Sequence, residues 1–267
     1  MTNKGNWFDY THKLITNWLA SHSIGKSEVK RVIDCLSSGT RQDRINSGSL
    51  QCPEIFCPGL RSQPWYDKNE FAWAEFIEKN FSTIQYEFDK IYSERNTSHH
   101  PENEKLAQDG VWGAFYFYRS GNAYPENIKK CPETMKIFQQ IPGIDTAGSV
   151  FFSTLSPRSN IKPHYGPHNF RIRCHMGIIV PNDCLISVGN ISKNWKIGKC
   201  IFFDDSFLHF VQNDSDQERM VLILDIWHPD LTTNEVNLLQ YVMSEHIKLL
   251  KSGKILEQTP ESVYEFM

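Results

Sequence analysis

Near both ends of the chain, apolar residues recur at three- and four-residue spacing, which is the period of an amphipathic helix. Residues 7–38 show this pattern on both sides of a turn at 23–25, and residues 69–92 and 235–250 show it without interruption. We expect two N-terminal helices, one helix over 69–92 and one C-terminal helix. Their apolar faces are predicted to pack as core.

Two polar segments interrupt these helical patterns. Residues 39–51 are rich in Ser, Gly, Asn and charged residues, and residues 93–109 are similarly polar. Both are predicted to be loops. The second segment contains two adjacent histidines, His99 and His100, which we expect to be exposed and to which we assign no role.

Beyond Gly110 the chain consists of short β-rich runs separated by Gly, Pro, Asn and Asp. The predicted strands are residues 112–118, 150–155, 171–180, 185–188, 199–203, 207–212 and 220–227. Many short strands in one domain favour a sandwich or a jelly roll, in which two stacked sheets limit the exposed edges. The sequence therefore predicts a mainly β fold with helices at both ends.

Composition and charge limit the kinds of molecule that the chain is expected to bind. The chain has 267 residues, of which 40% are hydrophobic, so it can bury the core of one large domain. Its formal net charge is -3, and Lys and Arg are scattered among Asp and Glu. This balance does not suggest a nucleic-acid or membrane-surface partner.

The expected location is the cytoplasm. The N-terminus does not resemble a signal peptide, and no apolar run is long enough to span a bilayer. The 7 Cys residues are irregularly spaced and include no Cys-x-x-Cys pair. This spacing argues against a disulfide framework and a structural zinc site, and it suits a reducing compartment.

Two histidines stand out as candidate metal ligands. His164 lies where a predicted strand gives way to a turn, and His209 follows an apolar strand and a pair of acids. Alone, each would more often be a structural histidine. Two histidines that converge from distant strands at the mouth of a barrel are, however, a plausible Fe(II) pair. Gly166 stands where iron oxygenases with a His-x-Asp or His-x-Glu motif carry the carboxylate, so it supplies no side-chain ligand.

The two acids before His209 have different interpretations. Adjacent acids after a strand are commonly turn formers whose side chains accept hydrogen bonds from local backbone N–H groups. We adopt that interpretation for Asp204. Asp205, four residues before His209, is predicted to orient a ligand or a water molecule near the metal instead.

A row of basic side chains is predicted on one strand. Arg171, Arg173 and His175 alternate with apolar residues, so their side chains share one face. A row of cationic side chains that points into a barrel needs negatively charged partners there. A dicarboxylate co-substrate would supply them through charge-assisted hydrogen bonds.

Arg219 extends this argument to a second strand. It immediately precedes the predicted strand 220–227. If that strand pairs beside the one that carries His209, Arg219 meets the far carboxylate of the same dicarboxylate. Without the two histidines, a solvated surface charge would be the better interpretation of each arginine.

Taken in order, these motifs resemble the aspartyl/asparaginyl β-hydroxylase family of 2-oxoglutarate-dependent oxygenases. The resemblance covers roughly residues 52–231. Its motifs are FCPGL (56–60), PWYD (64–67), CPET (131–134), FSTL (152–155), PHYGPHN (163–169), RIRCHMG (171–177), GK (198–199), FDDSFLH (203–209), Arg219 and WHPDL (227–231).

The resemblance implies a fold, cofactors and site residues. The family fold is a double-stranded β-helix, a cupin-like jelly roll. By similarity, His164 and His209 hold Fe(II), and Asp205 is an acid near the vacant iron position. The residues expected to bind 2-oxoglutarate are Ser153, Arg173, His175 and Arg219.

The resemblance also implies a reaction and a domain organisation. With Fe(II), 2-oxoglutarate and O2, the enzyme would hydroxylate the β-carbon of an aspartyl or asparaginyl unit in a peptide, a protein, a carrier-bound or a free molecule. Residues 1–51 form a helical extension, 52–234 the oxygenase domain, and 235–267 a C-terminal helix that packs on that domain.

Three alternatives remain at this point. The vacant carboxylate position would admit a halide, which would make the protein a halogenase. A catalytically silent barrel would act as a binding module. A cupin-like isomerase or zinc enzyme would need a third protein ligand such as His175 or His228.

Overall fold

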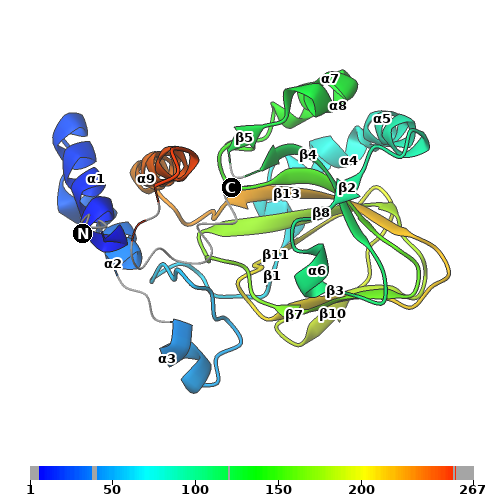
Figure 1. The fold of residues 1–267 in the computed structure, drawn as a ribbon, viewed down its shortest axis with the longest axis horizontal. Coiled ribbons are helices and arrows are strands. Elements are labelled where there is room, and N and C mark those ends of the chain that lie inside the picture. The colour runs from blue at the N-terminus through cyan, green and yellow to red at the C-terminus, as the bar shows by residue number, and fades with distance from the viewer. Residues whose placement is uncertain (1–5, 38–40, 120, 255, 257–267) are drawn as a thin grey trace. The chain divides into compact units, whose positions relative to one another are not determined.

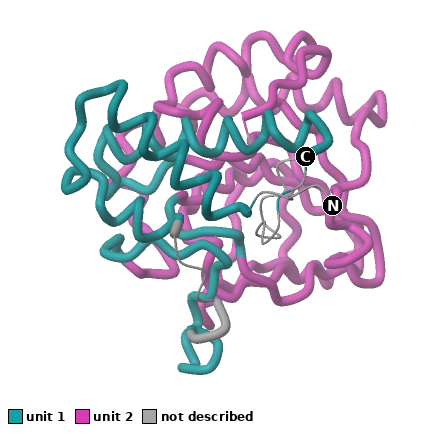
Figure 2. The backbone as a smooth tube through the Cα atoms, turned by 60° about the vertical axis from the view of Figure 1, so that its left-hand side comes forward, with its two compact units in different colours: residues 1–61, 166–170, 227–267 teal, residues 62–165, 171–226 magenta. Residues whose placement is uncertain are grey.

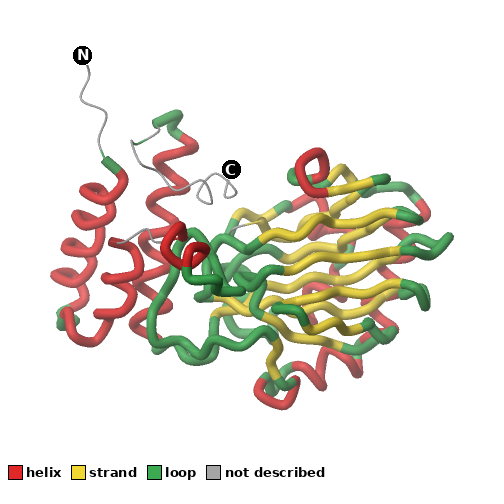
Figure 3. Tube along the Cα trace, turned by 90° about the horizontal axis from the view of Figure 1, so that it is seen from below, coloured by secondary structure: helices red, strands yellow, loops and turns green. Residues whose placement is uncertain are grey.

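The computed structural model describes residues 6–37, 41–119, 121–254 and 256. It divides into two compact units, which are shown in different colours in Figure 2. Unit 1 comprises residues 1–61, 166–170 and 227–267, and unit 2 comprises residues 62–165 and 171–226. The helices at both ends of the chain belong to unit 1, and nearly all of the strands lie in unit 2. Figure 3 shows the helices in red and the strands in yellow.

Unit 2 is built on two antiparallel sheets, counted over its described residues (Figure 1). The strands are β1 (Trp65–Tyr66), β2 (Ser98–His99), β3 (Ala107–Gln108), β4 (Trp112–Arg119), β5 (Asn122–Ala123), β6 (Val150–Leu155), β7 (Ser159–His164), β8 (Arg171–Ile179), β9 (Cys184–Val188), β10 (Ile191–Lys193), β11 (Cys200–Phe203), β12 (His209–Asn213) and β13 (Arg219–Trp227). One sheet has the order β1-β11-β8-β13-β6-β4-β2, with β5 on β4, and the other has the order β10-β9-β12-β7-β3.

The path of the chain between these sheets defines the fold. From β6 to β13, successive strands alternate between the larger and the smaller sheet, apart from the hairpin of β9 and β10. This alternation is the double-stranded β-helix, and it confirms the predicted mainly β jelly roll. The strand that carries His164, β7, and the strand that begins at His209, β12, are neighbours in the smaller sheet.

Strands β4, β6 and β13 of the larger sheet are buried on both faces along most of their length, which explains why they are nearly continuous apolar runs. In β4, Trp112 and Tyr116 pack in the apolar cluster between the two sheets. Phe115 and Phe117 point the other way and pack in a second cluster with residues of the covering helices. Every residue of β6 is buried.

The helices of unit 2 supply that outer cover and differ in part from the prediction. They are α4 (Ala74–Lys79), α5 (Phe81–Ser93), α6 (Asn103–Leu106), α7 (Pro125–Lys130) and α8 (Pro132–Phe138), with a short 3-10 turn, η2 (Lys68–Glu70). The single helix expected over 69–92 is wrong, because it is divided at Asn80. The Asn80 side chain donates to the carbonyl oxygen of Phe76 at 2.9 Å, and its ψ of 12° ends the first helical run.

Other differences occur in polar segments. The expected loop over 93–109 contains β2, α6 and β3, and the expected loop over 39–51 contains α3 (Arg41–Asn46); residues 39 and 40 lie outside the described part of the chain. Helices α7 and α8 were not predicted. Each begins with a proline at its first position, where the missing N–H costs no helical hydrogen bond.

Unit 1 confirms the helices expected at both ends of the chain. They are α1 (Trp7–His22), the 3-10 turn η1 (Lys26–Val29), α2 (Lys30–Ser37) and α9 (Thr233–Lys251). Apolar residues of these helices, including Trp18, Val32 and Leu238, form one buried cluster. The N-terminus of α9 is fixed by a capping box between Thr232 and Glu235. Residue 255 and residues 257–267 of the predicted C-terminal segment lie outside the described part of the chain.

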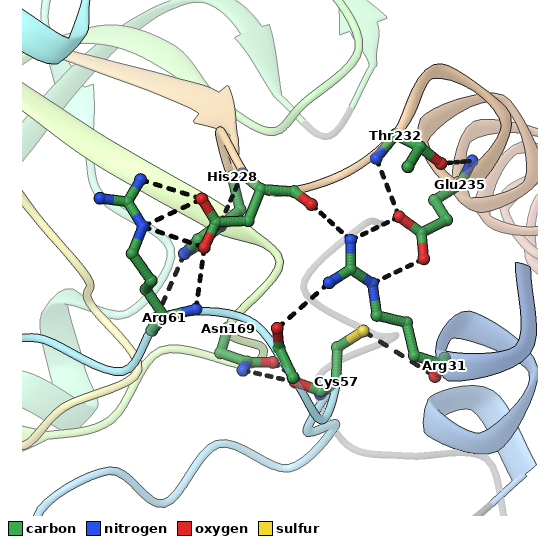
Figure 4. Close-up of polar contacts among 9 residues, drawn as sticks. Arg31, Cys57, Arg61, Asn169, His228, Thr232 and Glu235 are labelled. Carbon is green, nitrogen blue, oxygen red and sulfur yellow. Dashed lines mark hydrogen bonds and ion pairs between the residues drawn. The ribbon is translucent and has the colours of Figure 1, made fainter.

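Polar contacts join the segments of unit 1 (Figure 4). The Arg31 guanidinium donates to both carboxylate oxygens of Glu235, at 2.6 Å each, and to the backbone carbonyls of Gly59 and Asp230. The Asp230 carboxylate in turn accepts from Arg61 at 2.9 Å. A single arginine of α2 therefore neutralises the buried acid of α9 and binds two loops.

A buried histidine of α9 makes the helix pair sensitive to acid. His246 stacks on Trp7 with ring centroids 3.4 Å apart, and its Nε2 lies 2.9 Å from the Thr11 hydroxyl. Burial lowers the pKa of His246 from 6.5 to about 3. Below the unfolded-state pKa the unfolded chain binds a proton that the folded chain excludes, so stability is present above pH 6.5 and falls as the pH decreases toward 3.

We therefore expect the free energy of unfolding to fall by about 2 kcal/mol through His246 alone between neutral pH and about pH 5. Urea unfolding of the wild type and of His246→Gln at both pH values measures this contribution, because the variant cannot titrate. An identical pH dependence in the two proteins would contradict the assignment.

Candidate active site

The two candidate metal ligands face each other across a strand pair. His164 ends β7 and His209 begins β12, they are register partners, and their ring centroids are 4.0 Å apart. The Nδ1 of His164 bonds to the carbonyl oxygen of Lys162 at 2.7 Å, and the Nδ1 of His209 bonds to that of Phe207 at 2.9 Å. A carbonyl only accepts, so each Nδ1 carries the hydrogen and each Nε2 keeps a lone pair.

Both imidazoles are held neutral. Burial and, to a smaller extent, the nearby His164 lower the pKa of His209 to about 3. Burial also lowers the pKa of His164. Neutral imidazoles whose other nitrogen is oriented by a backbone carbonyl are the usual form of histidine ligands to Fe or Zn. The pair is thus prepared to bind a cation.

Asp205 lies beside this pair, fully buried. Although burial would raise the pKa of its carboxyl group, Arg171 and Arg173 hold that pKa far below its usual range, and His209 contributes in the same direction. Its Oδ2 accepts from Arg171 at 2.9 Å and from Arg173 at 3.1 Å. Its Oδ1 is buried and has no hydrogen-bond partner among the described residues. One acceptor is therefore left for a donor that the described residues do not supply.

A second aspartate completes an ion-pair cluster, which we define as Arg171, Arg173, Asp205 and Asp225. The Oδ1 of Asp225 accepts from Arg173 Nε at 2.8 Å, and its Oδ2 lies 3.4 Å from Arg171 Nη1. Asp225 is fully buried and is further fixed by the backbone N–H of Ser149 at 2.8 Å. The four charges sum to zero inside the protein, which makes their burial tolerable.

Arg219 contrasts with this cluster because it forms no ion pair with a carboxylate of the described residues. It is 1% exposed, and its contacts include the Ser153 hydroxyl at 3.2 Å and the Trp195 ring, whose centroid is 5.3 Å from Cζ. Its Nε is buried without a hydrogen-bond partner. Burial lowers the pKa of Arg219 to about 10, so the group stays charged at neutral pH.

His175 presents a second unsatisfied donor next to Arg219. Its Nδ1 accepts the indole N–H of Trp195 at 3.3 Å, so its Nε2 carries the hydrogen. That Nε2 is buried and unpartnered among the described residues. Burial lowers the pKa of His175 well below its usual range, and the charges of Arg173 and Arg219 act in the same direction. Buried donors without acceptors are costly, which indicates a place for an anionic ligand.

Ser153 connects this donor set to the inner face of the larger sheet. Its hydroxyl accepts from the indole N–H of Trp112 at 3.0 Å and lies in contact with Arg219. Ser153 is register partner of Val221 on β13, two residues beyond Arg219. The predicted residues Ser153, His175 and Arg219 are therefore brought together.

The donor set fits a metal with a chelating dicarboxylate. Two neutral histidines offer nitrogen ligands to Fe(II), and Asp205 offers an acceptor near them. Arg219 Nε and His175 Nε2, the two buried donors without a described partner, suit a carboxylate. Among the described residues there is no group of three or more His, Cys, Asp or Glu side chains that could hold a metal by themselves.

Three details of the predicted site need correction. The anions for Arg171 and Arg173 come from the protein itself, as Asp205 and Asp225, and not only from a co-substrate. The strand of Arg219 does not pair beside that of His209: β13 pairs with β6 in the larger sheet, and β12 lies in the smaller one.

The third correction concerns His100. It is half-buried, not exposed, and stacks on Trp112 with centroids 3.6 Å apart. By contrast, the turn-forming role of Asp204 is confirmed, because its Oδ1 accepts the backbone N–H of Ser206 at 2.9 Å.

His228 belongs to unit 1, where its Nδ1 accepts the backbone N–H of Asp230 at 3.1 Å and its Nε2 lies 3.3 Å from the carbonyl oxygen of Arg61. Both ring nitrogens thus have backbone partners. Gly166 is buried and also belongs to unit 1.

Sequence reasoning missed two important residues. Asp225 is the only acidic residue inside the apolar strand predicted at 220–227. It lies six residues after Arg219, so the two side chains point to the same face of the strand. A carboxylate at such a position indicates a buried charge with a partner. Trp195 gave no such signal, because it lies outside the predicted strands and its role depends on a contact with His175 from another strand.

Comparison with known proteins places the chain in a family. Residues 78–229 match the family model described as Aspartyl/Asparaginyl beta-hydroxylase. The human Aspartate beta-hydroxylase domain-containing protein 2 is 35% identical over 206 residues, which are 73% of this chain and 56% of that protein. The chain thus spans about half the length of this relative.

Two further relatives differ in what their names describe. Human Aspartyl/asparaginyl beta-hydroxylase is 32% identical over 66% of this chain and 24% of that protein. The Ornithine lipid ester-linked acyl 2-hydroxylase of Rhizobium tropici is 36% identical over 64% of this chain and 62% of that protein. Among solved structures, a Pseudomonas putida prolyl-4-hydroxylase is similar at a TM-score of 0.43 and 11% identity, over 62% of this chain and 94% of that one.

The matched region contains His164 and His209, the ion-pair cluster, and the buried donors of Arg219 and His175 that lack a described partner. It covers more than half of the chain, and it confirms the resemblance that the motifs predicted. The chain belongs to the aspartyl/asparaginyl beta-hydroxylase family.

Proposed function

We propose that this chain is an Fe(II)- and 2-oxoglutarate-dependent oxygenase that hydroxylates the β-carbon of an aspartyl or asparaginyl unit. The observation that carries the proposal is the pair of unsatisfied buried donors, Arg219 Nε and His175 Nε2, next to two neutral histidines with oriented rings. Donors and ligands of these kinds, this close together, match a metal and a bound carboxylate. The target carbon and a cytoplasmic location are parts of the same proposal.

Each residue then has a stated task. His164 and His209 would hold Fe(II) through Nε2, since their Nδ1–H groups already donate to backbone carbonyls. Iron with 2-oxoglutarate and O2 supplies the oxidising chemistry when bound, and the protein supplies position and electrostatics. The proposed contacts to 2-oxoglutarate are those of Ser153, Arg173, His175 and Arg219.

The protein groups differ in how they act on an anion. Arg219 keeps its charge and forms no ion pair with a described carboxylate, so a carboxylate that binds there gains a charge-assisted pair. His175 remains neutral and donates from Nε2 because Trp195 fixes its tautomer. Arg173 is held in place by Asp205 and Asp225. The unpaired Oδ1 of Asp205 suits a hydrogen-bond donor such as water.

The relatives favour hydroxylation over a binding role. Their printed names describe hydroxylases of aspartyl or asparaginyl residues and of a lipid acyl chain. A silent barrel would have no need of a buried, unpaired arginine, because replacing such a group by an apolar residue would remove its desolvation penalty.

Anaerobic titration with Fe(II) and 2-oxoglutarate tests the proposed cofactor pair. We expect a visible charge-transfer band from the chelate in the wild type and its loss in His209→Ala, because one of two protein ligands is removed. The exposed His99→Ala variant should retain the band. Folded wild-type protein without any band would exclude the proposed chemistry.

Arg219→Met separates co-substrate binding from metal binding. Loss of one partner of a buried charge pair costs about 2–5 kcal/mol, so 2-oxoglutarate should bind roughly 30-fold or more weakly while Fe(II) affinity stays nearly unchanged. Calorimetric titration of each ligand measures both. Equal losses for metal and co-substrate would contradict the role of Arg219.

Arg173→Met is the matched control for that experiment. Removing Arg173 leaves Asp205 and Asp225 short of a cation, so the metal-free protein should lose about 3–5 kcal/mol of stability. Arg219→Met should leave the stability of the metal-free protein unchanged or higher, because the wild-type cation forms no ion pair with any described carboxylate. Urea unfolding compares the two variants, and similar destabilisation by both would show that Arg219 has a structural partner after all.

A further inference from the structure

We propose that His100 and Arg119 bind a carboxylate of the substrate. The inference rests on the proposed function and deepens it, since it assigns an acidic substrate to the same site. It comes from two donors that the co-substrate assignment does not use. One is a rigid neutral imidazole, and the other is a guanidinium without a carboxylate partner among the described residues.

The imidazole of His100 is fixed in position and in tautomer. Its ring lies parallel to that of Trp112, at 3.6 Å between centroids and 3° between planes, and its backbone N–H donates to the Trp112 carbonyl at 2.8 Å. Its Nδ1 accepts the backbone N–H of Glu102 at 3.1 Å. Nε2 therefore carries the hydrogen, and no hydrogen bond from Nε2 occurs within the described part of the chain.

This ring adjoins the site through Trp112. The indole N–H of Trp112 donates to the Ser153 hydroxyl at 3.0 Å, and Arg219 contacts the same hydroxyl. The charges of Arg173 and Arg119 act on His100 and, after burial, help to lower its pKa to about 3. His100 is thus a neutral donor at physiological pH, near the ion-pair cluster.

Arg119 supplies the unmatched charge. It ends β4 just beyond an irregularity between Tyr116 and Tyr118, and its Cζ lies 5.9 Å from the centre of the Tyr116 ring. Arg119 is half-buried, and no described carboxylate forms an ion pair with it. Glu102, the acid adjoining His100, is paired with Lys105 at 3.4 Å.

Charge balance then selects the ligand. Arg171 and Arg173 are neutralised by Asp205 and Asp225. The carboxylate assigned to Arg219 belongs to the co-substrate. Arg119 remains, and His100, whose ring centroid lies 6.1 Å from that of Tyr116, the ring that Arg119 also approaches, offers a donor from Nε2. A cationic group would be repelled there, and a group that only donates would find no acceptor. A carboxylate accepts two parallel bonds from a guanidinium and has lone pairs left for an imidazole N–H.

The test uses two nearly isosteric probes, N-acetyl-L-aspartate methylamide and N-acetyl-L-asparagine methylamide. Calorimetry measures their binding to the full chain under anaerobic conditions, with Fe(II) and 2-oxoglutarate present and, separately, without them. We expect the wild type to bind the aspartyl probe roughly tenfold or more tightly than the asparaginyl probe, because only the former carries the charge.

The variants are chosen to preserve structure while removing single donors. In His100→Asn, the amide oxygen still accepts the N–H of Glu102, but the Nε2 donor is lost. Arg119→Gln removes the charge and Arg119→Lys retains it. Lys129→Gln removes an exposed charge from α7 as a control. We expect His100→Asn and Arg119→Gln to abolish the preference for the aspartyl probe, Arg119→Lys to restore part of it, and Lys129→Gln to leave it intact.

The outcomes separate this inference from the proposed function. The chelate band in the same samples reports on the cofactors, whereas the preference between probes reports on His100 and Arg119. A wild type that binds neither probe, binds both equally, or keeps its preference in His100→Asn and Arg119→Gln overturns the inference even when the band forms. A preference without a band supports the carboxylate site and overturns the proposed cofactors.

Discussion

The neutralisation of Arg171 and Arg173 by Asp205 and Asp225 is the interaction on which the site depends. These side chains come from β8, β13 and the segment before β12, so the cluster ties the larger sheet to the chain that leads into His209. Because its charges sum to zero, two guanidinium groups are buried without a ligand. The cluster also holds Asp205 ionised and leaves its Oδ1 available beside the histidine pair.

The buried charged and polar side chains of unit 2 differ in whether the protein itself supplies their partners. The charges of the cluster balance within the protein, and the Nδ1 groups of His164 and His209 donate to backbone carbonyls. Arg219 Nε and His175 Nε2 have no hydrogen-bond partner among the described residues, and the contacts with Ser153 and Trp195 orient these side chains without neutralising Arg219. A protein that tolerates such donors loses stability there and gains a prepared site for an anion. This difference distinguishes Arg171 and Arg173, whose charges the protein neutralises, from Arg219, which forms no ion pair with a described carboxylate.

Much of this arrangement was predictable from the sequence, because local signals were strong. Helical spacing identified α1, α2 and α9, and short apolar runs identified most core strands. Ordered motifs identified the family, and alternation placed Arg171, Arg173 and His175 on one face. The break at Asn80 and the helices at 125–138 were missed, since a side-chain bond to the backbone and tertiary packing override spacing there.

The sequence by itself determined the residue types, the mainly β fold and the two histidines as candidate ligands, because periodicity and motif order are local properties of the chain. Only the tertiary structure decided which charges meet. Asp225 and Arg173 are 52 residues apart, and Trp195 and His175 are 20 apart. Whether an arginine is neutralised or free for a ligand depends on those distant contacts, and chain spacing alone does not specify them.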